Sequence, residues 1–552
     1  MIRPRAIPKS SHSTEAFSTI SSWLEECLKE HPQCKSKDDI LPTRLISIDQ
    51  STSETRLVVS DGSLGEWVVL SHCWGTNRHG ITTTSNIEAR QEVLDLETLP
   101  QMFRDAVEIT RKLGFQYLWI DSLCIIQDSR LDWQLESMKM DQYFMGASLN
   151  ISASASLATD ATKGIFFTAD EGRENFHPFA AMPAHSTSTA AEGTIYFRRT
   201  NTSGRKQPNV PPSKGKDSPL RRRAWVLQES QLSPRILWCD SKSIGWDCAV
   251  AMKSELEQRE SAILSVMATK FLHRPVTDGK VDGLRQRHDA LGWWYGTVND
   301  YMTREIKFQS DRVPALAGLA KAFASRTGFQ YICGLWKEDL PRGLFWNACR
   351  SKVSTEGAEL RKGPPSWSWV SLPTLDTKLA IFAEEERDIA YDSELVRFNA
   401  TNVNGNTYGL IESASLTLRS RWQRCADLEE PYFNTRDNCK ILFPQDVGER
   451  RETYEERCRL EENQHHIGVV ATLDAPEGDS LNPEAIYLQL GKQKRRPAIW
   501  HKYGEEPLWV FQALILELVE GEVEEYRRVG IAEIRVDLAE GDGWNVKAFT
   551  II

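Results

Sequence analysis

The carboxylate of Glu136 is the side chain with the clearest potential for chemistry. It is the only charged member of a stripe at helical spacing, whose other members are Trp133, Met140 and Tyr143. Partial desolvation disfavours the charged form of a carboxylate, whereas a helix N-terminus one turn away favours it, so such a group is a candidate catalytic residue. The alternative is that Glu136 lies at the edge of the stripe and pairs with a lysine or arginine.

A predicted strand and helix would position that carboxylate. An apolar run at 117–120, rich in aromatic and branched residues, predicts a buried strand that ends at Asp121. Helix start signals follow at Asp128, Ser129 and Asp132. Because ligands of open parallel sheets bind beyond the carboxyl ends of the strands, Asp121 stands where chemistry usually occurs.

A second polar stretch, LSHCWG at residues 70–75, also ends an apolar run. It supplies Ser71, His72 and Trp74. The segment 99–114 predicts a helix between the two strands, and a strand–helix–strand order gives parallel strands with a right-handed crossover. Both strand ends would then open on one edge of the sheet, so we predict that the two stretches form a single site.

A thiol mechanism is an alternative use of these stretches. Cys73 or Cys124 would act as nucleophile with His72 as its base, which requires the thiol and the imidazole to face one another. His72 and Cys73 are sequence neighbours, and their side chains diverge if the strand continues. Buried cysteines act more often as small core residues, which argues against this mechanism.

Three potential metal ligands, Cys27, His31 and Cys34, fall close together near the start of the chain. Structural zinc sites use four ligands, and no paired cysteine or histidine follows nearby. We therefore predict no metal site here.

Composition indicates an ordinary globular protein of about two to four domains. The 552 residues include 67 basic and 77 acidic side chains, a net charge of −10, which gives no basic surface for nucleic acid. No apolar run approaches the roughly 20 residues that a membrane helix needs, and the first residues lack a signal-peptide core. The 11 scattered cysteines indicate reduced thiols. We expect a cytoplasmic protein without a membrane span.

The pattern of the chain predicts a protein of the α/β class that is divided into four regions. Residues 1–30 are a polar tail and a short helix, and residues 31–250 read as a parallel sheet flanked by helices. Residues 251–363 are mainly helical in pattern. Residues 364–552 contain short alternating segments and would form a β-rich region.

Three blocks of this sequence resemble the heterokaryon incompatibility (HET) domain of filamentous fungi. They are LSHCWG, the stretch 118–154 that begins LWIDSLCIIQDS, and RAWVLQESQLSPRIL at 223–237. The resemblance covers about residues 30–250. It implies a role in non-self recognition and in the programmed cell death that follows fusion of incompatible cells.

The resemblance also implies a distant relationship to TIR domains and their flavodoxin-like fold. Several TIR domains cleave the nicotinamide–ribose bond of NAD with a glutamate on a helix, after a tryptophan-containing motif. The pair Trp133 and Glu136 resembles that motif. By this analogy Glu136 takes the place of the catalytic glutamate. Asp121, at the end of a strand, is the second predicted catalytic residue, which would hydrogen-bond a substrate hydroxyl or hold the loop. The predicted substrate-binding residues are Ser71, His72, Trp74, Asp128 and Trp133.

NAD would be a substrate of this site and not a bound cofactor. The chain lacks a GxGxxG fingerprint and a GxxxxGK[ST] phosphate loop, so neither dehydrogenase-type dinucleotide binding nor an NTPase is indicated. We expect a homo-oligomer or a protein partner in activation. The alternative function is a non-catalytic module that signals by self-association or docking.

Overall fold

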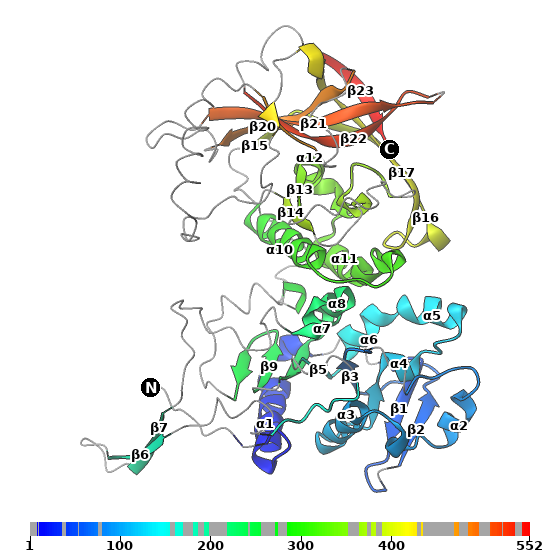
Figure 1. Cartoon of the computed structure of the whole chain (residues 1–552), viewed down its shortest axis with the longest axis vertical. Coiled ribbons are helices and arrows are strands. Elements are labelled where there is room, and N and C mark those ends of the chain that lie inside the picture. Colours follow the sequence, from blue (N-terminus) through cyan, green and yellow to red (C-terminus); the bar gives the residue numbers. More distant parts are fainter. Residues whose placement is uncertain are drawn as a thin grey trace. The chain divides into compact units, whose positions relative to one another are not determined.

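The computed structural model divides the chain into two compact units (Figure 1). The N-terminal unit comprises Met1–Gly279 with Pro314–Ala322, and the C-terminal unit comprises Lys280–Val313 with Phe323–Ile552. The structure describes residues 8, 10–35, 40–52, 54–75, 80–154, 161–168, 180–185, 192–197, 218–240, 243–255, 271–273, 284–350, 364–372, 377–381, 389–427, 432–433, 469–473, 484–495, 508–521, 523–535 and 544–552.

A mixed sheet forms the centre of the N-terminal unit. Its described strands run in the order β10-β9-β8-β5-β3-β4-β1-β2. Their bounds are β1 Arg44–Ile48, β2 Thr55–Val59, β3 Trp67–Ser71, β4 Tyr117–Trp119, β5 Leu149–Ala153, β8 Arg235–Cys239, β9 Ile244–Cys248 and β10 Met252–Ser254. The four central strands β8, β5, β3 and β4 are parallel, as the sequence predicted, whereas the pairs at both edges are antiparallel. A separate hairpin pairs β6 (Ala180–His185) with β7 (Glu192–Phe197).

Helices flank this sheet (Figure 1). Those of the N-terminal unit that position the site are α1 Thr14–Glu30, α2 Ile87–Glu92, α3 Gln101–Lys112, α4 Asp121–Cys124, α5 Arg130–Ser137, α6 Met140–Gly146, α7 Pro219–Arg222 and α8 Ala224–Leu232. The predicted helix between β3 and β4 is α3. It ends before Gly114, whose φ of 83° is the left-handed conformation that glycine adopts without strain.

The single helix predicted to carry Glu136 is two helices in the structure. The chain breaks between α5 and α6 at Met138 and Lys139. Glu136 is 2% exposed, but Trp133 is 37% exposed and so does not share its buried face. Two residues that are three positions apart on a helix differ by about 60° around its axis. This difference is enough to place Trp133 at the edge of the buried face on which Glu136 lies.

Aromatic packing fixes α6 on the sheet. All five residues of β3 and of β5 are buried, as expected for strands covered on both faces. Trp119, at the end of β4, is fully buried and contacts the rings of Tyr143 and Phe144 at centroid distances of 5.4 and 5.8 Å. The position of Tyr143 is therefore set by the core and not by solvent-exposed contacts.

The C-terminal unit contains a large β-sheet, which agrees with the β-rich region predicted from the sequence. Its described strands are β15 Ile389–Tyr391, β16 Glu394–Asn402, β17 Ile411–Arg424, β18 Tyr432–Phe433, β19 Val469–Leu473, β20 Ile486–Arg495, β21 Leu508–Val519, β22 Glu525–Arg535 and β23 Asn545–Ile551. The longest helix among the described residues of this unit is α10 (Leu284–Met302). Across the residues that the structure describes, no helix combines the length and the apolar character needed to cross a bilayer.

Candidate functional site

The two polar stretches meet at the carboxyl edge of the parallel strands. β3 and β4 are parallel neighbours, so the chain after Ser71 and the chain at Asp121 emerge on the same side. Trp74 Nε1 donates a hydrogen bond of 2.8 Å to Asp121 Oδ2, and Ser122 N donates to Asp121 Oδ1 at 2.7 Å. His72 Nδ1 lies 3.7 Å from Asp121 Oδ1. The predicted convergence of the two stretches is confirmed.

His72 is held neutral inside this edge. Burial lowers the pKa of its imidazole, and the negative charge of Asp121 opposes that shift only in part. The ring packs edge-on against Phe103 at 5.1 Å, and Arg223 NH1 donates to the His72 carbonyl oxygen at 2.6 Å. A neutral imidazole can accept or donate a hydrogen bond to a polar ligand without an ionic charge.

Several buried polar atoms at this edge lack a hydrogen-bond partner within the described part of the chain. They are Ser71 Oγ, His72 Nδ1, Ser122 Oγ and Ser152 Oγ. Ser71 and Ser152 are register partners on β3 and β5. An unsatisfied buried hydroxyl costs about 1–3 kcal/mol, so a cluster of them at a strand edge is a reasonable place for a polar ligand.

Glu136 forms a second polar group beside the start of β1. Tyr143 Oη donates to Glu136 Oε2 at 2.7 Å, and Lys139 Nζ lies 3.4 Å from Oε1. Thr43 completes the group, because its Oγ1 accepts from Lys139 Nζ at 2.9 Å and lies 3.0 Å from Tyr143 Oη. The Glu136 carboxylate is buried, as expected for a candidate catalytic group, and it is also paired with a lysine, as expected for a structural ion pair.

Cys124 lies within the electrostatic reach of both polar groups. Burial is the largest cause that raises the pKa of its thiol, to about 12, and the charges of Asp121 and Glu136 add to the effect while Arg44 opposes it. Burial also raises the pKa of the Cys73 thiol. Both thiols therefore stay protonated at neutral pH, which argues against the nucleophilic cysteine mechanism. Within the described residues, no hydrogen bond joins Glu136 directly to Asp121 or His72.

The other two predicted binding residues lie at the surface. Asp128 accepts hydrogen bonds from Thr84 N at 2.8 Å and from Thr84 Oγ1 at 2.7 Å. It thereby holds the segment 80–86, which follows the LSHCWG stretch, against the loop before α5. Trp133 lies on an outer face of α5 and is 37% exposed. Within the described residues, no hydrogen bond joins Asp128 or Trp133 to His72 or Asp121.

Replacing Asp128 by alanine is expected to release the segment 80–86. The hydrogen bonds from Thr84 lower the pKa of the Asp128 carboxyl group in the folded protein. The stabilisation from these hydrogen bonds is therefore complete above about pH 4, the pKa of an unfolded aspartate, and is lost as the pH falls through the lower pKa of the folded state. Amide hydrogen exchange of residues 80–86, normalised to intrinsic rates, measures the effect. Asp128→Asn keeps an acceptor oxygen and should be intermediate, whereas unchanged protection in Asp128→Ala would contradict the anchoring role.

A third group brings together four potential metal ligands from distant parts of the chain. Their ligand atoms all lie within 4.8 Å of one another. We refer to them as the cysteine–histidine cluster, which consists of Cys27, His31, Cys34 and Cys248. The sequence revealed the first three residues but missed Cys248, because β9 delivers it from 217 positions beyond His31 without any spacing signal.

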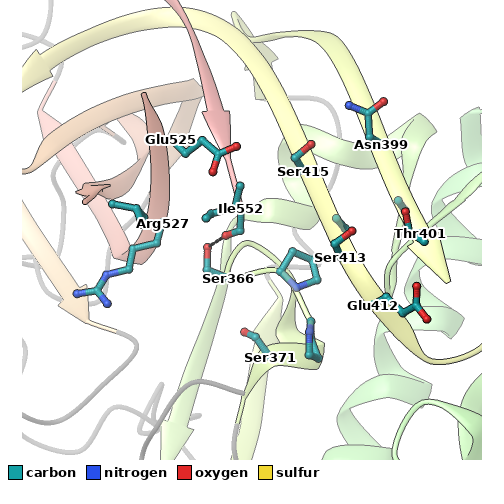
Figure 2. A pocket seen from close by; sticks show the side chains of 15 residues that line it. Ser366, Ser371, Asn399, Thr401, Glu412, Ser413, Ser415, Glu525, Arg527 and Ile552 are labelled. Atoms are coloured by element: carbon teal, nitrogen blue, oxygen red, sulfur yellow. Dashed lines mark hydrogen bonds between the residues drawn. The ribbon is translucent and has the colours of Figure 1, made fainter. Parts of the chain in front are cut away.

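The C-terminal unit contains a cavity of about 620 Å³. Figure 2 shows Ser413 and Ser415 on one strand of its wall and Asn399 and Thr401 on the adjacent strand, with Ser366 bonded to the Ile552 carbonyl. The described lining combines hydroxyl, amide and charged side chains with alanines, two prolines, Val519 and Ile552, and it includes no histidine or cysteine. The described lining therefore offers no thiol or imidazole for a cysteine–histidine or serine–histidine pair.

The N-terminal unit thus belongs to the class of α/β domains that gather polar groups at the carboxyl edge of central parallel strands. Residues 67–229 match the family model of the heterokaryon incompatibility protein (HET), so this part of the chain is a HET domain. The match confirms the family indicated by the three sequence blocks and indicates a role in heterokaryon incompatibility. The matched residues 67–229 include His72, Asp121 and Glu136. Neither the search of curated proteins nor that of solved structures gave a significant match.

Proposed function

We propose that this chain is an effector of heterokaryon incompatibility whose HET domain cleaves NAD at the nicotinamide–ribose bond. The observation that carries the proposal is the buried carboxylate of Glu136, a residue that is 2% exposed and lies within the matched domain. Its Oε2 accepts a hydrogen bond of 2.7 Å from the Tyr143 hydroxyl. A desolvated carboxylate fixed by a core tyrosine is suited to stabilise positive charge on a ribose.

The proposed reaction makes modest demands on the protein. The bond from ribose C1′ to the nicotinamide nitrogen breaks with its electron pair going to the ring, which leaves as a neutral base. Water adds at C1′ and releases a proton. Glu136 stabilises the oxocarbenium-like centre, as carboxylates do in glycoside hydrolysis. Lys139, whose side chain is 43% exposed, moves toward solvent so that Glu136 Oε1 can accept the ribose hydroxyls while Tyr143 holds Oε2.

The strand order supports a flavodoxin-like, and hence TIR-like, relationship. Taken in chain order, the parallel strands β3, β4, β5 and β8 are arranged as β4-β3-β5-β8, which is the 2-1-3-4 order of flavodoxin-like sheets. In such sheets the ligand binds at the switch point between the first and third strands. Ser71 is the last residue of β3, and its register partner Ser152 is the next-to-last residue of β5. Asp121 and Trp74, which are hydrogen-bonded to each other, lie one strand away. In this proposal they bind the rest of the dinucleotide.

Incubation of the full chain with NAD tests the proposal. Free nicotinamide and ADP-ribose should appear in equal amounts and in proportion to the protein added, as measured by chromatography. The protein concentration should be varied over a wide range, because we expect self-association to promote activity. No nicotinamide above the protein-free control at any concentration of folded protein would overturn the catalytic function.

A non-catalytic signalling module is the second candidate, favoured by an exposed apolar face on α5. Leu131 and Leu135 of α5 and its C-cap Met138 are exposed and, at positions i, i+4 and i+7, share one face. Trp133 is exposed on the opposite side of the helix and is not part of this face. Such a patch is typical of a protein interaction site. If folded protein releases no nicotinamide but self-associates in sedimentation, and Leu135→Lys abolishes that association while the exposed control Gln142→Lys does not, the module function is the better account.

A further inference from the structure

The cysteine–histidine cluster is built at a junction of three elements. Cys27 lies in the last turn of α1, and His31 follows as its C-cap, with its N–H bonded to the Cys27 carbonyl at 3.1 Å. Cys34 is the last residue of the short 3-10 helix η1 (Pro32–Cys34). The backbone N–H of Cys34 donates a hydrogen bond of 2.9 Å to the His31 carbonyl oxygen. Cys248 ends β9. The local turn therefore fixes three ligands, and the sheet supplies the fourth.

The spacing of the ligand atoms suits a tetrahedral ion. Zinc binds sulfur at about 2.3 Å and imidazole nitrogen at about 2.0–2.1 Å, which places the ligand atoms of a tetrahedral site about 3.6–3.8 Å apart. Cys248 Sγ lies 3.5 Å from His31 Nδ1, and all four ligand atoms fit within 4.8 Å. The three cysteines are buried and His31 is half-buried, as expected for a closed structural site.

Hydrogen-bond donors surround the sulfur atoms. Arg235 Nε donates to Cys27 Sγ at 3.3 Å, and Ala251 N donates to Cys248 Sγ at 3.3 Å. The other guanidinium bond goes from Arg235 NH1 to the Ser148 carbonyl at 3.1 Å. Arg235 is buried and neither of these acceptors is a carboxylate, so its positive charge requires a nearby negative charge. Three thiolates around a Zn²⁺ ion would carry a net charge of −1, which this arginine would neutralise.

We propose that the cysteine–histidine cluster binds one structural zinc ion. Three thiolates and one imidazole in a tetrahedral arrangement form an established class of structural zinc site. The ion would fasten α1 and η1, which precede the matched HET domain, to β9, which follows it. A disulfide is the competing use of these thiols, but it would engage only two sulfur atoms and would leave the third cysteine, His31 and the Arg235 charge without a common role.

The metal content of the full chain, purified without a polyhistidine tag or chelator, tests the proposal. Elemental analysis should find one zinc ion per chain in the wild type. Cys248→Ser should lose stoichiometric zinc, whereas Cys239→Ser should retain it. Cys239 is a matched control, because it is a buried cysteine on the neighbouring strand β8 and pairs with Ile244 at the opposite end of β9.

A second measurement covers the case in which Cys248→Ser does not fold. Wild-type protein loaded with Co²⁺ should show the thiolate charge-transfer and ligand-field bands of a tetrahedral site, and His31→Cys should still bind the metal with an added thiolate band. Metal-free wild-type protein, a predominant metal other than zinc, or a disulfide within the cluster in mass spectra of non-reduced protein would each overturn the proposal. Equal zinc loss in Cys239→Ser and Cys248→Ser would also overturn it.

Discussion

Replacing Glu136 by glutamine is expected to lower the rate of NAD cleavage by about 1,000-fold, equal to about 4 kcal/mol in the activation barrier. Glutamine has nearly the same shape and still offers an oxygen to the Tyr143 hydroxyl, which now lies 2.7 Å from Glu136 Oε2. It loses the negative charge that the proposed oxocarbenium-like state requires. Initial rates of nicotinamide release by wild-type and variant protein, both shown to be folded by circular dichroism, give the comparison.

Two further variants separate the charge of Glu136 from its packing. Tyr143→Phe removes the hydroxyl but leaves the carboxylate, so the rate should fall by only about tenfold, the size of one lost hydrogen bond. Glu92→Gln changes an exposed acid on α2 and should leave the rate unchanged. A folded Glu136→Gln protein with the wild-type rate would instead assign this carboxylate to the ion pair with Lys139, the structural role that the sequence also allowed.

The parallel core could be predicted because its signals are local. β3, α3 and β4 each show their own periodicity, and the right-handed crossover rule then places Ser71 and Asp121 on the same edge. The hairpin of β1 with β2 and the pair of β8 with β9 also follow from short strands separated by turns. A site at the ends of β3 and β4 was therefore within reach of the sequence.

Contacts between distant segments could not be predicted in the same way. The break between α5 and α6 places Met140 and Tyr143 on a different helix from Glu136, although the stripe in the sequence suggested one continuous helix. Trp133 shares α5 with Glu136 but is exposed. Cys248 joins a local cysteine–histidine turn only through the position of β9 in the sheet. Periodicity reports which face of an element is buried, but it contains no information about which distant element covers that face.

One such distant contact, between Arg44 and Asp132, supports the second large prediction. Arg44→Met is expected to destabilise the N-terminal unit by about 3–5 kcal/mol, the usual effect of removing one partner of a buried ion pair. Arg44 NH2 lies 2.5 Å from Asp132 Oδ2, and their side chains are 9% and 16% exposed. Arg44 Nε also donates to the Cys124 carbonyl at 2.7 Å, and Asp132 Oδ2 accepts from Ile126 N at 2.8 Å.

Denaturant unfolding of the full chain, with the transition of the N-terminal unit followed separately, measures this loss. Arg104→Met is the matched control, because Arg104 pairs with Glu97 at 3.2 Å but their side chains are 31% and 88% exposed, and such a pair contributes at most about 1 kcal/mol. Equal losses in both variants would mean that burial does not strengthen the contact of Arg44 with Asp132. If Arg44→Met loses more stability than Arg104→Met, a desolvated charge pair holds the start of α5, and with it Glu136, against β1. Arg44→Met should then also reduce nicotinamide release.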